Sequence, residues 1–199
     1  LPKRHELVGR TCANLRPWGW NPRIDAFLSP LAPQAPPTCS APSFSKAWFA
    51  ERYAQLVDTL PFEEFCVLDP APFQATSVEA ALTNVEALFE SGFPMVIIKS
   101  PWGASGQRNI RLRPGEPNEK QAIWMQRTLS VQGSLVVEGF FDKVIDLSFQ
   151  FDVGKETTFR SRGLTRPMTD QLGRFRGLFL TRPLKDLETE TRDFALRAT

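Results

Sequence analysis

The feature that most constrains this chain is a short apolar run that ends in a lysine and leads directly into a glycine loop. The run PMVIIK, residues 94–99, is rich in β-branched side chains and predicts a strand covered on both faces. The loop SPWGASGQ, residues 100–107, follows it, and RNIRL, residues 108–112, predicts the strand that returns. Glycines let backbone N–H groups approach phosphate oxygens, and a lysine at a strand end can reach the same phosphates. This segment therefore predicts a nucleotide site.

The order of these elements excludes two common nucleotide motifs. A P-loop requires a lysine and then Ser or Thr after its last glycine, but Gly106 is followed by Gln107 and Arg108. A protein kinase also has a strand that ends in lysine, but its glycine loop comes before that lysine, whereas here it comes after. Neither family fits the sequence.

Three helices are predicted in the first two thirds of the chain. Apolar residues recur at three- and four-residue steps over 44–60, which is the spacing of a helix with one buried face. Thr76 and Glu79 predict a capping box at the start of a second helix, and Gly92 lies where a left-handed C-terminal cap belongs. A third helix is predicted over 119–130.

The second half of the chain predicts an antiparallel sheet. Residues 144–153 alternate strictly between apolar and polar side chains, as in a strand with one face in water. A strand over SLVVEGFF, residues 134–141, precedes them, and short strands are predicted over 157–162 and 175–181. Turns are predicted at Gly154, Pro167 and Gly173.

Composition excludes several classes of function. The 199 residues are 42% hydrophobic and 23% charged, as in soluble globular proteins, and no run of roughly 18 apolar residues could cross a membrane, so a cytoplasmic protein is expected. One histidine, His5, and three cysteines without close pairing exclude a zinc site and a histidine-dependent catalytic triad. The net charge of +2 does not by itself imply nucleic acid.

Side chains suited to the rest of a nucleotide come later in the chain. Glu138 and the backbone after it can pair with an adenine edge, and Asp146 can accept from ribose hydroxyls. Phe140 and Phe141 can supply apolar walls. Taken alone, Lys99 is typical of a snorkelling surface lysine, Glu138 of a solvated strand end and Asp146 of the wet face of its strand. Their order around the glycine loop favours an ATP site.

The chain resembles the ATP-grasp superfamily, and in particular a bacterial branch of it. Five phrases carry the resemblance in the family's order: LRPWGWN at 15–21, SFSKAWFAERYAQL at 43–56, VIIKSPWGASGQ at 96–107, QGSLVVEGFFDKVIDLSFQF at 132–151 and GLTRPMTDQLGRFRG at 163–177. The resemblance implies a two-lobed α+β fold with mixed and antiparallel sheets, present here in part. It divides the chain into residues 1–42, the remnant of an N-terminal domain plus a Pro-rich linker, 43–130, the N-lobe with the glycine loop, and 131–199, the start of the antiparallel C-lobe.

The resemblance also implies a set of ATP-binding residues. Lys46 and Lys99 correspond to the two phosphate-contacting lysines. The remaining residues are the mobile loop Ser100, Gly103, Ser105 and Gly106, the adenine hinge Glu138, Gly139, Phe140 and Phe141, and the ribose acid Asp146.

Magnesium is expected for the superfamily, whose metal ligands come late, on an acidic strand followed by a Glu-x-Asn pair. Nothing downstream of Arg182 matches them, so no metal ligand and no catalytic residue is assigned. Two explanations stay open. Either the sequence stops before the metal-binding strand, or it is a degenerate copy that binds magnesium poorly.

A basic stretch over 155–185 suggests a second anion-binding feature. Alternation along strands predicts that Arg160 and Arg162 share one face, as do Arg174 and Arg176, and that the four form a cluster for a phosphate or a substrate carboxylate.

Three functions are weighed. The first is an ATP-dependent ligase that forms an acylphosphate from a small carboxylate and passes it to an amine or thiol. The second is a catalytically inactive ATP-binding module. The third is a single-stranded nucleic-acid-binding domain in which Phe159, Phe175 and Phe179 stack on bases beside the basic stretch.

Overall fold

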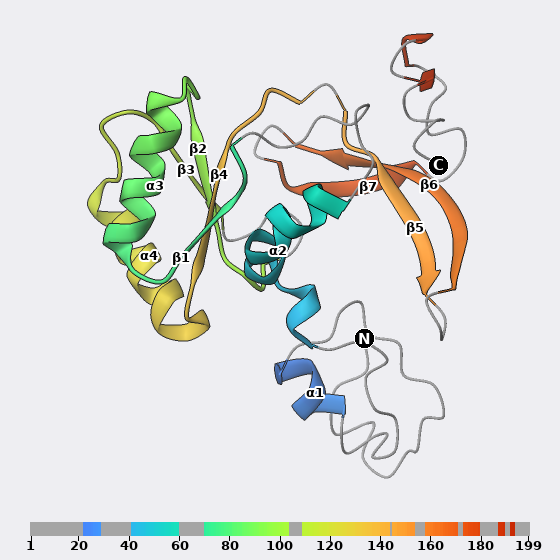
Figure 1. The fold of residues 1–199 in the computed structure, drawn as a ribbon, viewed down its shortest axis with the longest axis horizontal. Helices are drawn as coiled ribbons and strands as arrows, with labels where there is room; N and C mark the ends of the chain where they lie inside the picture. The colour runs from blue at the N-terminus through green and yellow to red at the C-terminus, as the bar shows by residue number, and fades with distance from the viewer. Residues whose placement is uncertain are drawn as a thin grey trace. The chain divides into compact units, whose positions relative to one another are not determined.

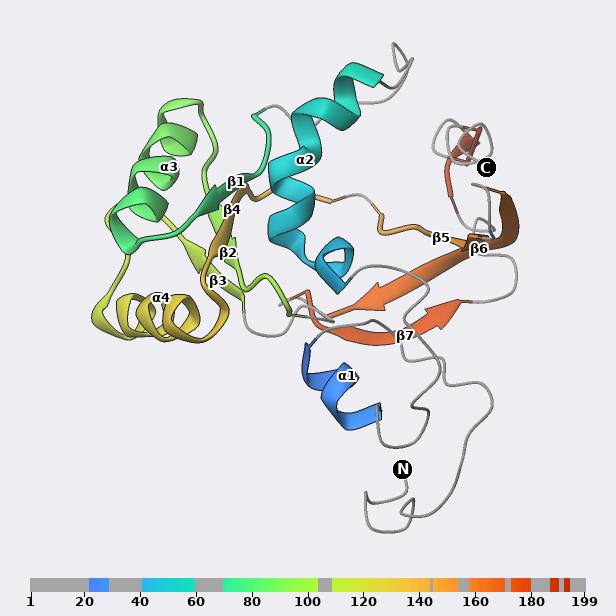
Figure 2. The same cartoon turned by 60° about the horizontal axis from the view of Figure 1, so that its bottom comes forward.

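The computed structural model describes the chain in stretches. These are residues 22–28, 41–59, 70–103, 109–143, 145–153, 158–170, 173–179, 187–189 and 192–193. They fall into two compact units (Figures 1 and 2): one runs up to Gly103 and resumes over 109–140, and the other begins at Phe141. Among the described residues, no helix has the length and apolar character needed to cross a membrane.

The first unit is built on a four-stranded sheet with the order β1-β4-β2-β3. The strands are β1 (Phe73–Ala75), β2 (Val96–Lys99), β3 (Asn109–Leu112) and β4 (Leu135–Gly139), and all the pairs are antiparallel. Helices α3 (Val78–Glu90) and α4 (Glu119–Gln132) cover one face, while α2 (Lys46–Thr59) lies on the other side of the sheet (Figures 1 and 2). The two short helices α1 (Pro22–Leu28) and η2 (Ala41–Phe44) were not predicted.

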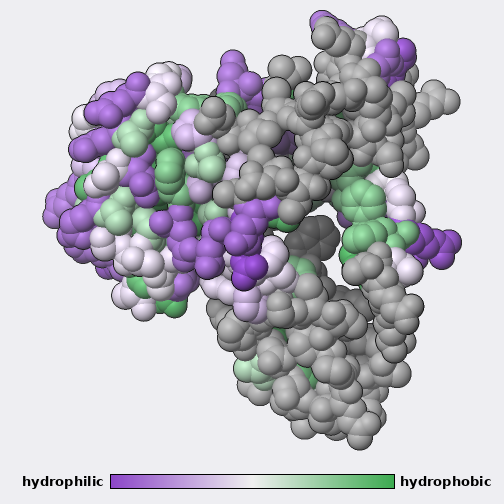
Figure 3. Space-filling view, viewed as in Figure 1, coloured by the Kyte–Doolittle hydropathy of each residue, from purple (hydrophilic) through white to green (hydrophobic). Residues whose placement is uncertain are grey.

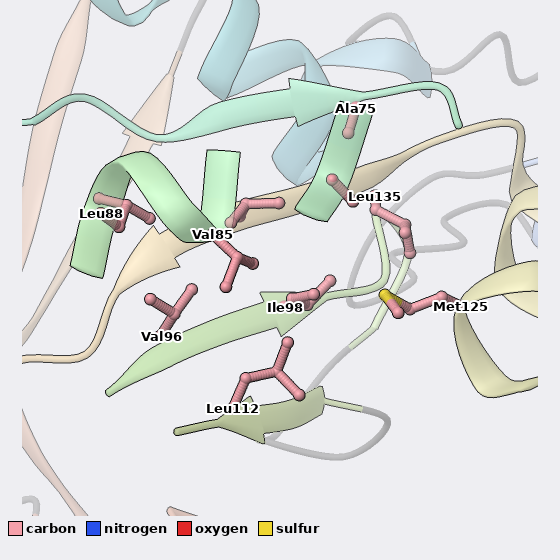
Figure 4. Packing of buried hydrophobic residues seen from close by; sticks show 10 residues of the cluster. Ala75, Val85, Leu88, Val96, Ile98, Leu112, Met125 and Leu135 are labelled. Atoms are coloured by element: carbon pink, nitrogen blue, oxygen red, sulfur yellow. The ribbon is translucent and has the colours of Figure 1, made fainter. Parts of the chain in front are cut away.

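The core of this unit lies between the sheet and α3 and α4 (Figure 4). Val96 and Ile98 point to this side from β2 and are fully buried, together with Leu88 of α3 and Met125 of α4. Each fully buried side chain of this size contributes about 1.5–3 kcal/mol. The outer surface of the two helices carries many hydrophilic side chains (Figure 3), as expected for amphipathic helices with one buried stripe.

The N-terminal cap of α3 is a different residue from the predicted one. The N-cap of α3 is Ser77, whose side chain accepts from the backbone N–H of Ala80, so the predicted box starting at Thr76 is wrong by one residue. Both residues carry the hydroxyl that a cap requires, so composition could not separate them. Gly92 does adopt a positive φ of 94°, as predicted. Asn118 and Gln121 form a reciprocal capping box on α4.

The second unit is a three-stranded antiparallel sheet with the order β5-β6-β7. Its strands are β5 (Ser148–Val153), β6 (Phe159–Thr169) and β7 (Phe175–Phe179), so β5 is shorter than the predicted strand over 144–153. The turn at Gly173 is confirmed by its bond to the carbonyl of Asp170, 2.8 Å. The predicted turn at Gly154 lies outside the described residues.

The predicted turn at Pro167 is wrong, because Pro167 lies inside β6 and pairs with Leu178 of β7. The described pairing of β5 with β6 ends at Thr165, so one side of the strand at Pro167 has no neighbouring strand among the described residues. A residue without a backbone N–H is tolerated there.

The boundary between the units also differs from the predicted lobe boundary at residues 130 and 131. β4 was expected to begin the second lobe, but it pairs with both β1 and β2 and is therefore a central strand of the first sheet. The compact units separate at Phe140 and Phe141 instead.

Candidate functional site

The first unit brings Lys99 and Glu138 together on the face of the sheet opposite the α3 and α4 core. In the antiparallel pairing of β2 with β4, Glu138 lies opposite Ile97, so it shares a face with Lys99 two residues further along β2. The Lys99 ammonium donates to Oε2 of Glu138 in an ion pair. The side chains are 24% and 22% exposed, so the pair is shielded from water but still reachable.

Lys46 joins this pair from the first turn of α2. Its backbone N–H donates to the carbonyl of Pro101, 3.1 Å away, and its ammonium donates to the carbonyl of Gly103 and lies 3.5 Å from that of Ser100. Burial lowers the pKa of Lys46, the positive charge of Lys99 lowers it further, and Glu138 partly opposes both effects. The two lysines and the glutamate therefore form one electrostatic group.

The start of the glycine loop is a defined turn. The backbone N–H of Gly103 donates to the carbonyl of Ser100, 3.2 Å, and that of Trp102 donates to the side chain of Gln132 on α4, 3.0 Å. Ser100 is only 1% exposed, so its side chain belongs to the interior at the end of β2. Of the expected mobile loop, Ser105 and Gly106 lie outside the described residues.

Two buried polar atoms next to Lys99 lack a hydrogen-bond partner among the described residues. They are the hydroxyl oxygen of Ser100 and Oδ1 of Asn109, the residue that pairs with Lys99 across β2 and β3. Leaving such a group without a partner costs about 1–3 kcal/mol. Both atoms lie at the end of the sheet where the glycine loop begins.

The sheet also presents an aromatic ring and an arginine on the face of Glu138. The backbone N–H of Phe140 donates to the carbonyl of Met95, 2.9 Å, and the guanidinium carbon of Arg111 lies 4.4 Å from the centre of the Phe140 ring. Ile97 pairs with Glu138 on one side and with Arg111 on the other, so the three residues form a row across β4, β2 and β3.

Arg111 was not singled out from the sequence. Alternation over β3 could have indicated it, because that pattern places Asn109 and Arg111 on one face and Ile110 and Leu112 on the other. The face they belong to depends on the strand order, which the sequence does not display.

Gly139 faces the core side of β4 rather than the side of Glu138. A Cβ at this position would overlap the ring of Phe93, so the glycine makes room for that side chain. Packing against Phe93 thus accounts for the glycine without any contact to a ligand.

The other expected nucleotide residues belong to the second unit. Phe141 is 43% exposed and begins this unit. Asp146 lies ahead of β5 and accepts from the ammonium of Lys143 through both carboxylate oxygens, at 2.9 and 3.0 Å.

The four arginines expected to form one cluster are divided between two parts of the second sheet. Arg162 forms an ion pair with Asp152 of β5, and Arg160 pairs in register with the same residue. Arg176 forms an ion pair with Asp170 at the turn into β7, 2.9 Å, beside Arg174.

The two ion pairs lie at different positions along β6. The stretch of β6 from Arg162 to Thr169 spans roughly 20 Å at the usual rise per residue. The single clamp stays a prediction, because alternation fixes the face of each arginine but not its position along the sheet.

The residues present suit a phosphate better than a metal ion. Ammonium groups and backbone N–H groups are the donors that phosphate oxygens accept from. Within the part of the chain that the structure describes, no three His, Cys, Asp or Glu side chains come close enough to hold a metal ion.

Comparison with known proteins identifies the fold. No model of a protein family and no curated protein matches the sequence. Among solved structures, the chain is similar to D-alanyl-alanine synthetase A from Vibrio cholerae, an ATP-grasp enzyme, with a TM-score of 0.53 and 13% sequence identity. The match covers 88% of this chain and 52% of that protein, so this chain spans about half the length of its neighbour. The fold is α+β and resembles the ATP-grasp fold.

Proposed function

We propose that this chain is the ATP-binding core of an ATP-grasp-like ligase that joins a small carboxylate to an amine or a thiol. The observation that carries the proposal is the group formed by Lys46, Lys99 and Glu138 beside the first turn of the glycine loop. A fold shared with a synthetase gives this group its context.

The charges of the site favour a polyanionic ligand. Among the described residues, the ammonium groups of Lys46 and Lys99 lie on the same face of the sheet as the carboxylate of Glu138, so this group has a net positive charge. Both lysines are held by protein oxygens that triphosphate oxygens can replace: Lys46 by loop carbonyls and Lys99 by Glu138. A phosphate oxygen carries negative charge, so its contact with an ammonium group is stronger than the bonds that Lys46 makes to uncharged carbonyl oxygens.

In the proposed reaction, an oxygen of the substrate carboxylate attacks the γ-phosphorus of ATP, and the bond to the β-phosphate oxygen breaks to release ADP. The resulting acylphosphate is attacked by the amine or thiol, which displaces inorganic phosphate and loses its proton. Lys46 and Lys99 would hold the transferring phosphates and offset their charge, and positioning of this kind is the main source of catalysis in phosphoryl transfer. Magnesium is expected in such reactions, but the described residues supply no site for it and no step is assigned to it.

Calorimetry with ATP tests the proposal. The Lys99→Gln variant removes one phosphate contact and should bind ATP at least tenfold more weakly, which corresponds to about 1.4 kcal/mol. The matched control is Lys120→Gln, because Lys120 is exposed on α4, on the opposite side of the sheet. Equal ATP affinity in both variants would contradict the proposal. Binding of ATP without release of ADP in the presence of candidate substrates would favour a catalytically inactive ATP-binding module instead.

Binding of single-stranded nucleic acid is a second candidate, favoured by the exposure of Phe159, Phe175 and Phe179 in the sheet that carries the arginines. Base stacking on such rings is sequence-tolerant and is accompanied by a strong dependence on salt. Salt-dependent binding of an oligonucleotide that persists in the Lys99→Gln variant would support this candidate over the nucleotide site.

A further inference from the structure

Arg111 and Phe140 form a stacked pair whose role the ligase chemistry does not explain. The guanidinium carbon lies 4.4 Å from the ring centre, which is within the range of a cation–π contact. The two residues come from different strands, β3 and the end of β4, and both side chains lie on the face of Glu138. The contact therefore links β3 to the end of β4, the two strands that flank β2.

The position of the pair separates it from the phosphate end of the site. Arg111 lies in the row of Glu138 and Ile97, whereas Lys99 lies in the next row, with Asn109, where β2 runs into the glycine loop. Phe140 lies one row further from the loop, because its N–H bonds to Met95. The sheet thus presents cations at the loop end, and flat or apolar groups at the other end.

The chemistry of these groups matches a planar heterocycle. A guanidinium is planar and stacks on aromatic faces, and a phenylalanine ring stacks on nucleobases irrespective of their hydrogen-bonding edge. Ile97 adds an apolar floor between Arg111 and Glu138. Glu138 adds a carboxylate that can accept from an amino group on the edge of a base.

We propose that Arg111 is a positioning residue for the base of the nucleotide: it fixes the Phe140 ring so that the site selects a nucleoside triphosphate over a bare polyphosphate. This inference rests on the proposed function, since it concerns the same site. It assigns to Arg111 a role in base selection, in contrast to the alternative in which Arg111 is simply a third phosphate contact.

Two ligands separate these roles: ATP and inorganic tripolyphosphate, each titrated calorimetrically into the full chain. Arg111→Ala should weaken ATP binding by about three- to tenfold and change tripolyphosphate binding by less than about twofold. Arg111→Lys, which keeps the charge but loses the planar group, should resemble Arg111→Ala. The matched control is Arg113→Ala, because Arg113 is exposed just beyond the end of β3.

A second variant, Phe140→Leu, removes the ring itself and should give the same loss for ATP alone. It keeps the test decisive if Arg111→Ala fails to fold, which thermal unfolding would reveal. An equal loss for both ligands that Arg111→Lys restores would overturn the inference in favour of a phosphate contact. Unchanged ATP binding in Arg111→Ala, alongside weakened binding in Lys99→Gln, would overturn this inference and leave the proposed function standing. Absence of ATP binding by the wild-type chain would overturn both.

Discussion

Glu138→Gln is the perturbation that most directly exposes the electrostatics of the site. The substitution keeps the size of the side chain but removes the negative charge that pairs with Lys99 and also favours the protonated form of Lys46. Two ammonium groups then face each other without a compensating carboxylate, and the structure predicts a loss of stability.

The magnitude follows from the exposure of the pair. Two unit charges about 4 Å apart interact by about 4 kcal/mol at an effective dielectric constant of about 20. The side chains of Lys99 and Glu138 are 24% and 22% exposed, so water screens part of this interaction, and desolvation offsets more of it. We expect the free energy of unfolding to fall by about 1–2 kcal/mol, between the values typical of exposed and buried pairs.

Urea denaturation followed by tryptophan fluorescence measures this change. A loss of about 1–2 kcal/mol lowers the midpoint by roughly 0.5–1 M urea. The matched control, Glu86→Gln, alters an exposed glutamate on α3 and should leave the midpoint in place. In the double variant Lys99→Gln/Glu138→Gln, the loss should be smaller than the sum of the two single losses. Strict additivity, or a Glu138→Gln variant as stable as the wild type, would refute the account of this pair.

Three further predictions concern the frame around the site. Ser77→Ala should destabilise the chain by about 1 kcal/mol in the same denaturation assay, because Ser77 caps α3, whereas Thr76→Ala should have almost no effect. A larger loss of stability in Thr76→Ala than in Ser77→Ala would identify Thr76 as the cap instead. Gly139→Ala should lower the free energy of unfolding by about 1–3 kcal/mol, because the added methyl group overlaps the ring of Phe93. Phe93→Ala should relieve that overlap in the double variant. A loss in the double variant equal to the sum of the two single losses would contradict the overlap. The pKa of Lys46 is lowered in the folded chain, so the unfolded chain binds more protons between the folded pKa and the unfolded value of 10.5. The free energy of unfolding should therefore rise with pH in that window, relative to the Lys46→Met variant. Parallel pH profiles of the two proteins would exclude the shift.

The strands around the glycine loop could be predicted because their signals are local. The β-branched run over 96–99 and the return over 109–112 are each short, apolar on one face and separated by a loop. The same holds for α2 and α4, whose apolar spacing lies within the segments themselves. Local patterns do not specify partners, so the sequence did not reveal that β4 pairs with β1 and β2 in the first sheet.

The site was predictable to the extent that it depends on strand ends. Lys99 ends β2 and Glu138 lies one residue before the end of β4, and the antiparallel register of these short strands brings them together with Lys46. Arg111 was missed because alternation gives the face of a side chain, while register and strand order decide which side chains meet. Register and strand order depend on how segments far apart in the sequence pair in the fold.

The most direct test of the central claim is a crystal structure of the full chain with a non-hydrolysable ATP analogue. The account predicts phosphate oxygens within hydrogen-bonding distance of the Lys46 and Lys99 ammonium groups, and the adenine against Phe140. An analogue bound elsewhere, with Lys99 still paired to Glu138 and Lys46 still bonded to the loop carbonyls, would contradict it.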